Sequence, residues 1–360
     1  MIDLAGPDPS ITPRKWMSRN SRSIELSEND PFEYFPLRDG LKPSSVGLKR
    51  LPAYGDPQKD CRFQFDSLFH RYRASKIRAR NERLSKYYQN SGAIDPQPVL
   101  ANIIDELTTV YPNYFSFDGS LLRCFLTGNE IRLDDQYRLV DQKTDLAIPY
   151  VDAFDAIAMQ VSEDLILHSV DGTRDFSSIV HLFHPNGWSA ESSIGQSFAL
   201  LHQGVPQINR VIPNPTQMVQ SLIRAPHVLE RIAAISFRTD TILNRHPEQP
   251  DSQRHQPFDR IHNPHLFMRL ERQTVTGFPQ ISSFLFTIKT YFVDCDQAGR
   301  DEFKQRCIRA AFEENNPNAF SHKFINENRA QVLAWLDERA PRCLSNAEIS
   351  PRSSTRVALR

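Results

Sequence analysis

The stretch HLFMRLERQTVTGFPQISSFLFTIKTYFV, residues 265–293, decides the fold class. Its two ends, HLFMRLERQTV and SSFLFTIKTYFV, alternate apolar and polar residues well enough to predict two strands. The segment TGFPQ between them contains Gly and Pro and predicts the connecting turn. The stretch therefore predicts a long pair of antiparallel strands.

Short apolar runs elsewhere, each broken by turn residues, predict further strands of an antiparallel sheet. They are LLRCFLTG (121–128), YRLVDQKT (137–144), DLILHSVDG (164–172) and SSIVHLFHPNGW (177–188). Apolar periodicity predicts helices over 65–88, 99–110 and 218–235, and one or two more within 299–338. Helices come first, then strands around a helical middle, then helices again, which predicts an α+β fold rather than a doubly wound sheet.

The chain ends differ in character from its middle. Residues 1–30 and 341–360 are polar with little periodicity and are predicted to be flexible tails, which leaves residues 31–340 as one predicted domain. Within that domain, residues 246–265 are polar and Pro-rich and predict a long surface loop. The helix expected over 65–88 is rich in Arg and Lys, which we interpret as a solvated helix face.

The charge balance argues against two classes of partner. The 360 residues carry 43 basic and 43 acidic side chains, so no global field favours nucleic acid or an anionic membrane. No apolar run approaches the roughly 18 to 20 residues of a spanning helix, and the amino terminus lacks the basic-then-apolar order of a secretory signal. We therefore expect a soluble cytoplasmic protein that binds neither nucleic acid nor membrane.

Several common motifs are missing from the sequence. The five cysteines are far apart and form no C-x-x-C or C-x-x-C-H, which fits a reducing compartment and predicts no structural zinc, iron–sulfur cluster or covalently attached haem in this chain. The motifs G-x-S-x-G, G-x-x-x-x-G-K-[ST], G-x-G-x-x-G and H-E-x-x-H are also absent. The sequence therefore lacks the usual signatures of ordinary hydrolases, P-loop enzymes and nicotinamide oxidoreductases.

One histidine occurs in a context that could bind a metal. In SSIGQSFALLHQGVPQINR, residues 192–210, a short predicted helix presents His202 before Gly204 and Pro206 end it. A neutral imidazole on an apolar wall is what a haem iron needs as its axial ligand. A lone histidine near a helix end is more often a core or capping residue that bonds the last carbonyls, and the residues alone favour that role.

The run RLERQT, residues 269–274, combines charges on a predicted strand. Because successive side chains point to opposite faces, Arg269, Glu271 and Gln273 should share one side and Arg272 should lie on the other. Glu271 could then pair with an arginine elsewhere, and Arg272 could reach a carboxylate such as a haem propionate, or a small polar ligand. The alternative is a structural ion-pair network on an exposed sheet.

Two histidine pairs have a spacing of three residues. His181 and His184 lie in a predicted strand, where this spacing points the rings to opposite sides, and Pro264 separates His262 from His265 in a loop. We therefore expect no zinc or non-haem iron site, and we interpret most of these histidines as surface residues.

Four segments taken together resemble a known family. EDLILHSVDG, FHPNGW, IGQSFALLHQGVP and RLERQTVTGFPQISSFLFTIKTY resemble, in this order, the haem-binding alpha subunits of the haem-dependent oxidative N-demethylases, long catalogued as a domain of unknown function. The likeness runs from about Phe35 to about Trp335. Its most specific part is Glu-Arg-Gln-Thr followed by a Phe-Pro turn and a Phe-x-Phe-Thr-Ile strand.

The resemblance implies a fold, a cofactor and a reaction. It implies a PAS-like antiparallel β-sheet with flanking helices that enclose haem b, and the oxidation of a small secondary amine such as dimethylamine by dioxygen, with electrons from separate flavin and iron–sulfur subunits. Carried over by motif, His202 would be the axial iron ligand. Glu271 and Arg272 would be the polar groups beside the reacting oxygen or contacts of the haem propionates, and Arg238 and Lys289 would be further cofactor contacts.

This chain departs from the family pattern at several positions. Ser162 replaces a usual Gln, Gly204 replaces the first proline after the histidine, Thr239 and Asp240 stand where Asn-Trp is usual, and Lys289 replaces an arginine. An aromatic lost from a pocket wall would open the pocket, which implies a different amine or a loss of catalysis. A lysine also lacks the fork that binds a propionate at two points. Two alternatives are a non-catalytic haem-binding PAS-like sensor or carrier, and a haem-free interaction protein.

Overall fold

The computed structural model describes residues 48–51, 61–203, 212–248, 258–262, 264–314 and 329–339. The tails expected at 1–30 and 341–360 lie outside these ranges, as do Gly204, Pro206 and residues 249–257 and 263 of the expected loop. Helices and two antiparallel sheets occur together in the described residues, which confirms the α+β class.

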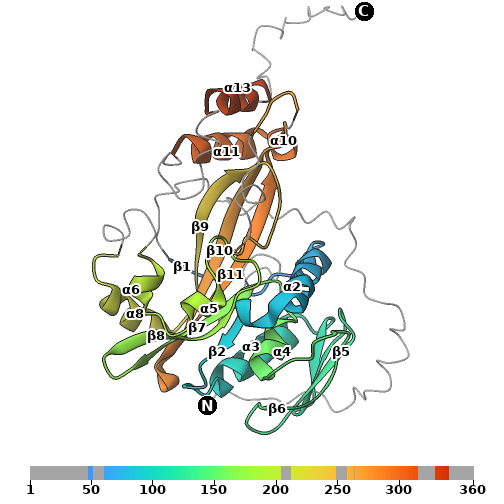
Figure 1. The fold of residues 1–360 in the computed structure, drawn as a ribbon, viewed down its shortest axis with the longest axis vertical. Helices are drawn as coiled ribbons and strands as arrows, with labels where there is room; N and C mark the ends of the chain where they lie inside the picture. The colour runs from blue at the N-terminus through green and yellow to red at the C-terminus, as the bar shows by residue number, and fades with distance from the viewer. Residues whose placement is uncertain are drawn as a thin grey trace, which may run out of the picture.

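The larger sheet has, among the described residues, seven strands in the order β1-β9-β10-β11-β7-β8-β2, and every neighbouring pair is antiparallel. Figure 1 shows β9, β10 and β11 as its long strands. The predicted hairpin is confirmed, because β10 and β11 pair along their whole length and are joined by a 3-10 turn, Pro279–Ile281. The strands are β1 (Lys49–Arg50), β2 (Tyr88–Asn90), β7 (Asp164–Asp171), β8 (Arg174–His181), β9 (Leu229–Arg238), β10 (Phe267–Phe278) and β11 (Ser283–Asp294).

The smaller sheet is a meander of four strands in chain order: β3 (Phe115–Phe117), β4 (Leu121–Cys124), β5 (Asn129–Leu133) and β6 (Leu139–Lys143). The helices of the described residues are α2 (Phe69–Arg83), α3 (Gln97–Val110), α4 (Ala153–Ala158), α5 (Ala190–Ser193), α6 (Phe198–Leu201), α8 (Pro215–Ile223), α10 (Cys295–Ala298), α11 (Glu302–Glu314) and α13 (Arg329–Arg339). The strands predicted from the four short runs, the helix over 99–110 and the C-terminal helices are thereby confirmed.

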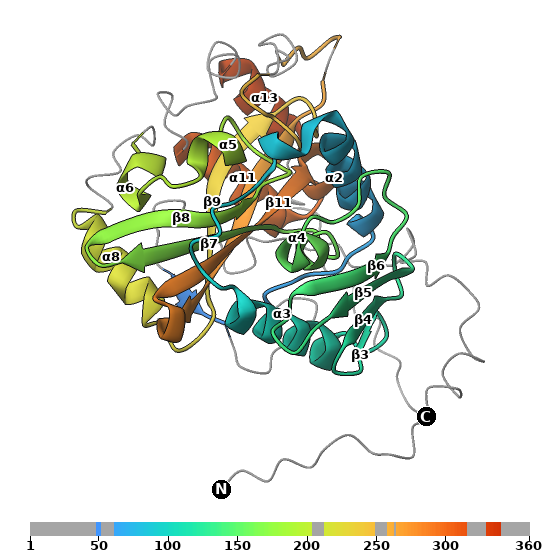
Figure 2. The same cartoon turned by 60° about the horizontal axis from the view of Figure 1, so that its bottom comes forward.

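Both faces of the larger sheet are covered (Figure 2). One face, here called the α2 face, packs Leu167 and Leu285 into a core with α2, α3, α4 and the smaller sheet. The other, here called the α6 face, packs Val275 and Phe284 against α6 and α8, and Ile288 against α5. The helices α11 and α13 cover the far end of the α2 face.

The prediction of a helix over 218–235 is wrong for the second half of this range. Helix α8 ends at Ile223, and Leu229–Arg238 forms strand β9 between β1 and β10. Pro226 has no N–H and cannot continue a helix. Beyond it, pairing with two neighbouring strands outweighs the helix propensity of the two adjacent alanines. This correction places Arg231 and Arg238 on the sheet.

The prediction that the basic helix presents its Arg and Lys residues to solvent is also wrong. Helix α2 is shorter than expected, and Arg73, Lys76 and Arg80 are buried. The Lys76 Nζ donates to the carbonyls of Ala158 at 3.0 Å and Glu163 at 2.6 Å. The helix lies against irregular backbone whose carbonyls need donors, and the basic side chains supply them.

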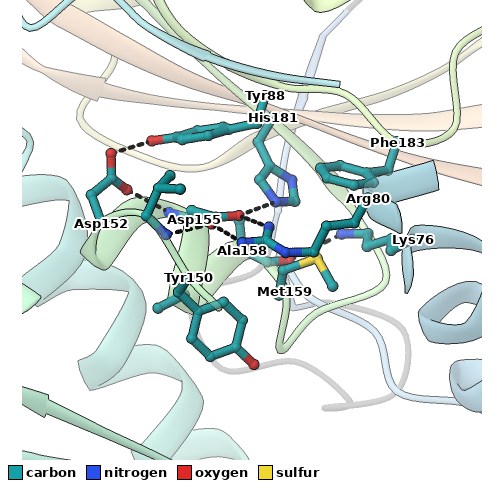
Figure 3. A network of polar contacts seen from close by, with 12 residues as sticks. Lys76, Arg80, Tyr88, Tyr150, Asp152, Asp155, Ala158, Met159, His181 and Phe183 are labelled. Atoms are coloured by element: carbon teal, nitrogen blue, oxygen red, sulfur yellow. Dashed lines mark hydrogen bonds and ion pairs between the residues drawn. The ribbon is translucent and has the colours of Figure 1, made fainter. Parts of the chain in front are cut away.

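A buried network joins α2 to α4 and β8 (Figure 3). Asp155 accepts from Arg80 Nη1 at 2.8 Å and Nη2 at 2.9 Å, and its Oδ1 lies 3.5 Å from His181 Nε2. Burial raises the pKa of Asp155, but His181 and Arg80 outweigh burial and hold it below its ordinary value. The carboxylate is therefore a charged partner that ties three elements together.

The surface interpretation of the histidines is wrong for His181 and His184, which are buried. Strand β8 is an interior strand of a sheet covered on both faces, and its residues from Phe176 to His181 are buried. Burial lowers the pKa of His181 to about 4, which keeps its ring neutral near pH 7. His262 is exposed and bonds Asp259, as a surface residue does.

Gly277 of β10 lies where the end of α8 crosses the sheet. A Cβ at this position would lie 2.3 Å from the carbonyl oxygen of Ile223 and 2.7 Å from that of Leu222. We expect Gly277→Ala to displace α8 and to lower the free energy of unfolding by about 1–3 kcal/mol, the usual effect of overpacking. Urea denaturation measures this, with the exposed Gln280→Ala as a control that should stay within about 0.5 kcal/mol of wild type. A stable G277A would contradict the close approach.

Candidate functional site

The short helix α6 is held at its start by two side chains. The Ser197 hydroxyl accepts from the N–H of Leu200 at 3.3 Å, as an N-cap does. Asp175 of β8 accepts from the N–H of Phe198 at 2.6 Å. These bonds fix the helix against β8 and place His202, the residue that ends it, beside the α6 face.

His202 adopts a defined tautomer. Its Nδ1 lies 2.8 Å from the carbonyl oxygen of Phe198, and because a carbonyl only accepts, Nδ1 carries the hydrogen and donates it. The two rings pack with centroids 4.2 Å apart. The capping bond expected from the sequence is thus present, and it leaves Nε2 with the lone pair. Nε2 makes no hydrogen bond to any residue that the structure describes.

The electrostatic surroundings keep the His202 ring neutral. Burial lowers the pKa of His202 below its ordinary value, the bond to Phe198 opposes this, and the nearby charge of Arg231 lowers it further. A neutral imidazole with one nitrogen tied to a carbonyl and the other free has the arrangement of a metal-binding histidine.

A second histidine supports the same helix. His168 of β7 lies with Nε2 2.8 Å from the Asp175 carboxylate and Nδ1 3.4 Å from the Ser177 hydroxyl. Its ring packs against Phe284 and Phe198, with centroids 5.2 and 6.0 Å apart. The bond with His168 lowers the pKa of Asp175. One carboxylate therefore connects the sheet to the start of the helix that presents His202.

A row of polar side chains crosses the α6 face of β9 and β10. Arg231 Nε donates to Gln273 Oε1 at 2.7 Å, Gln273 Nε2 donates to Glu271 Oε2 at 2.9 Å, and Glu271 Oε1 accepts from Arg269 Nη2 at 2.9 Å. The prediction that Arg269, Glu271 and Gln273 share one side, opposite Arg272, is confirmed. Arg269, Glu271 and Gln273 are buried rather than exposed, and Glu271 has both oxygens engaged.

Arg272 and Lys289 lie opposite each other in the β10–β11 register, on the α2 face. Arg272 ion-pairs with Glu230 and donates to the carbonyls of residues 62 at 3.0 Å and 61 at 2.7 Å. Lys289 donates to the carbonyl of residue 64 at 2.6 Å and to the carboxylate of residue 66 at 2.7 Å. Both side chains bind the segment 61–66, which lies on the α2 face of the sheet, away from His202.

Arg238 ends β9 on the α6 face. Its Nη2 donates to Asn186 Oδ1 at 3.2 Å, in the loop that follows β8. Burial, followed by the charges of Arg245 and Arg269, lowers the pKa of Arg238 to about 9. Asp240, one of the departures from the family pattern, pairs with Arg245 at 2.5 Å. This end of the α6 face therefore brings together three arginines, Arg238, Arg245 and Arg269, of which Arg245 and Arg269 pair with carboxylates.

The described residues contain no group of three or more His, Cys, Asp or Glu side chains that could hold a metal ion. The Nε2 of His202 on the α6 face is a free imidazole nitrogen, which suits a metal that arrives with its other ligands in a planar organic group. No helix in the described part of the chain is long and apolar enough to cross a membrane.

The family model for haem-dependent oxidative N-demethylase, alpha subunit-like proteins matches residues 57–333. The chain belongs to this family. The resemblance seen in the sequence is thereby confirmed, and the family description indicates dependence on haem and a place among other subunits. His202 and the polar row lie within the matched residues. No curated protein matches the chain.

Sequence reasoning missed His168, Asp175 and Arg231 as neighbours of His202. The alternation of DLILHSVDG would have placed His168 on one face with Ile166, but nothing local indicates that this face lies beside α6. Arg231 could not be recognised as a neighbour of His202, because the sequence predicted a helix for its segment.

Proposed function

We propose that this protein binds haem b through His202 on the α6 face, and that it is the alpha subunit of an oxygenase that demethylates a small secondary amine such as dimethylamine. The observation that carries the proposal is the Nδ1–H bond from His202 to the Phe198 carbonyl, because it fixes the ring and leaves Nε2 free for iron.

The side chains near His202 support a porphyrin site. Phe198, which packs against the His202 ring, forms an apolar cluster with Val275 and Phe284, and a polar row follows along β10, so the apolar part would suit the macrocycle and the polar row its carboxylates. The core strands lie in the order β8-β7-β11-β10-β9, a single antiparallel layer with helices on both faces. This arrangement supports the PAS-like architecture that the resemblance implies.

Bound haem would supply the activation of dioxygen, and the protein groups would position and shield the reaction. Asp175 and His168 hold α6 and therefore the direction of the His202 ring. Glu271 is held by Arg269 and Gln273, so it acts as an oriented acceptor rather than as a free base.

Among the other candidates, Arg238 stays a proposed cofactor contact because it lies on the α6 face. The proposal does not extend to Arg272 and Lys289, whose donors bind the segment 61–66 on the α2 face.

The proposal includes partners and a compartment. The family description as an alpha subunit supports separate flavin and iron–sulfur subunits that deliver electrons. Among the cysteines in the described part of the chain, Cys124 and Cys295 are buried free thiols. Free thiols are usual in the reducing cytoplasm, which supports a cytoplasmic location.

A second candidate is a haem-binding sensor or carrier without turnover. It is favoured by the Asp240–Arg245 ion pair, since a charged pair stands here where the family pattern has an aromatic residue. A pocket wall changed in this way would bind haem without positioning an amine.

Purified protein from haem-supplemented cells separates the two functions. We expect a coloured protein with a Soret band that, with dimethylamine, air and an artificial reductant, releases formaldehyde in proportion to the amine consumed. A Soret band without formaldehyde for any small secondary amine would favour the sensor or carrier. A colourless preparation that takes up no added haemin would contradict both.

A further inference from the structure

We propose that Arg269 and Ser236 form a buried binding site for the carboxylate group of a bound ligand. The site is assigned from its own unsatisfied donors. It deepens the proposed function and rests on it only for the identity of the ligand.

Arg269 is the centre of the site. Its side chain is 1% exposed, and its Nη2 donates to Glu271 at 2.9 Å and to the Thr290 hydroxyl at 3.2 Å. Its Nε and Nη1 are buried and have no hydrogen-bond partner among the described residues. Leaving a donor unpaired in the interior costs about 1–3 kcal/mol, and more for a charged group. Two such donors on one side chain indicate that a ligand acceptor forms hydrogen bonds with them in the functional protein.

Ser236 faces Arg269 across the β9–β10 ladder. The two residues are directly paired in the antiparallel register, so their side chains share the α6 face. The Ser236 Oγ is buried and also has no hydrogen-bond partner among the described residues. A hydroxyl beside a guanidinium adds one more donor to the same place.

His184, in the loop after β8, lies near this site, because the charge of Arg269 acts on its ring. The ring is buried and packs edge-on against Tyr72, whose backbone also acts on it as a hydrogen-bond partner. Its Nδ1 lies 3.7 Å from Asp164 Oδ1, beyond hydrogen-bond distance. Burial, with the charges of Lys76 and Arg269 adding to it, holds the pKa of His184 well below its ordinary value. The ring is therefore neutral, and we treat His184 as a neighbour of the site rather than as one of its donors.

The unpaired groups, the Nε and Nη1 of Arg269 and the hydroxyl of Ser236, can all donate, so the ligand group must be an acceptor. The charge of Arg238 adds to the positive potential at this end of the face, whereas Arg245 pairs with Asp240. A planar guanidinium matches a carboxylate or a phosphate, and a singly charged carboxylate loses less hydration free energy on burial than a doubly charged phosphate. The chemistry therefore favours a carboxylate.

At this position the carboxylate could belong to either of two ligands, haem or the substrate. Arg269 lies four residues along β10 from Gln273, which bonds Arg231 beside His202, a separation of roughly 13 Å at about 3.3 Å per strand residue. A porphyrin bound at His202 could reach Arg269 with a propionate. A substrate that carries its own carboxylate, an N-methyl amino acid, could reach it as well.

The first measurement uses haem-free protein and sodium propionate as the probe. A ligand that binds only the folded state raises the melting temperature, so propionate should raise it above the value in equal sodium chloride. Arg269→Met keeps the length of the side chain but removes the donors, and it should abolish this rise. Arg132→Gln, which removes an exposed arginine of the smaller sheet, should leave the rise unchanged. Melting temperatures by circular dichroism show that each variant folds.

The second measurement separates the two sources. If the propionate of haem is the ligand, R269M should bind haemin about 10- to 100-fold more weakly than wild type and bind haemin dimethyl ester equally well. If the substrate supplies the carboxylate, haemin affinity should be unchanged, and N-methylglycine should shift the Soret band of haem-loaded wild type but not of R269M. Arg269→Lys should show a smaller loss than R269M in either case, since it keeps the charge.

An R269M variant that equals wild type in all these measurements would overturn the carboxylate site. A wild-type protein that binds no haemin would overturn the proposed haem function instead. The propionate response of the haem-free protein would still decide the site in that case.

Discussion

Replacing His202 with alanine is expected to lower the affinity for haem by more than about 100-fold and to shift or abolish the Soret band. Changing a residue that merely orients a metal ligand typically lowers metal affinity 10- to 100-fold, so the loss of the ligand itself should exceed that range. The Nε2 of His202 has no competing hydrogen bond among the described residues, so its lone pair is the one given to iron. Haemin titration followed by absorbance measures the effect.

The matched control is His262→Ala, because His262 is an exposed histidine with a 79% exposed side chain and lies in another loop. It should keep both the Soret band and the affinity. Imidazole added to H202A should restore part of the spectrum by occupying the vacated position. A wild-type spectrum and affinity in H202A would show that another residue is the ligand, with His168 the next nearest candidate on the α6 face.

The second large effect is expected at Arg80 of α2. Arg80→Leu should lower the free energy of unfolding by about 3–5 kcal/mol, the typical result of removing one partner from a buried ion pair. Both Arg80 and Asp155 are fully buried, and the arginine also donates to the carbonyls of Ile148 and Pro149. The leucine variant would leave Asp155 in the interior without its ion-pair partner, in contact with the neutral His181 and the N–H of Val151.

The control for this experiment lies on the same helix. Arg83 is half exposed and pairs with Glu191 and Glu248 at the surface. Arg83→Leu should change the free energy of unfolding by less than about 1 kcal/mol, because exposed ion pairs contribute little. Urea denaturation at pH 7 compares the two variants, and equal effects would mean that the Arg80–Asp155 pair is not the strong contact that its burial indicates.

Local patterns predicted those elements whose side chains alternate clearly. The β10–β11 hairpin followed from regular alternation around a Pro-containing turn, and the opposite directions of Glu271 and Arg272 followed from the same period. Strand β9 was missed because LERIAAISFR lacks a regular alternation and gains its strand form from pairing with β1 and β10.

The burial of basic residues was not predictable from local sequence. The carbonyls that bind Lys76 lie 82 and 87 residues away along the chain, and those that bind Arg272 lie more than 200 residues away. Arginine and lysine on a helix or strand usually face solvent, so only the tertiary structure reveals that these donors satisfy buried backbone. His202 was found by motif, but its tautomer needed the coordinates.

The place of β7 beside β11 has a consequence for synthesis. The hydroxyls of Ser169 and Ser283 meet at 2.7 Å although they are 114 residues apart. At translation rates of about 5–20 residues per second, the β7 edge of the β7–β8 hairpin stays unpaired for roughly 6–23 s until its partner strand β11 has been synthesised. During that interval an unpaired apolar edge is open to chaperones and to other nascent chains. Haem bound as proposed at His202 would meet a complete α6 face only after β11 has joined the sheet.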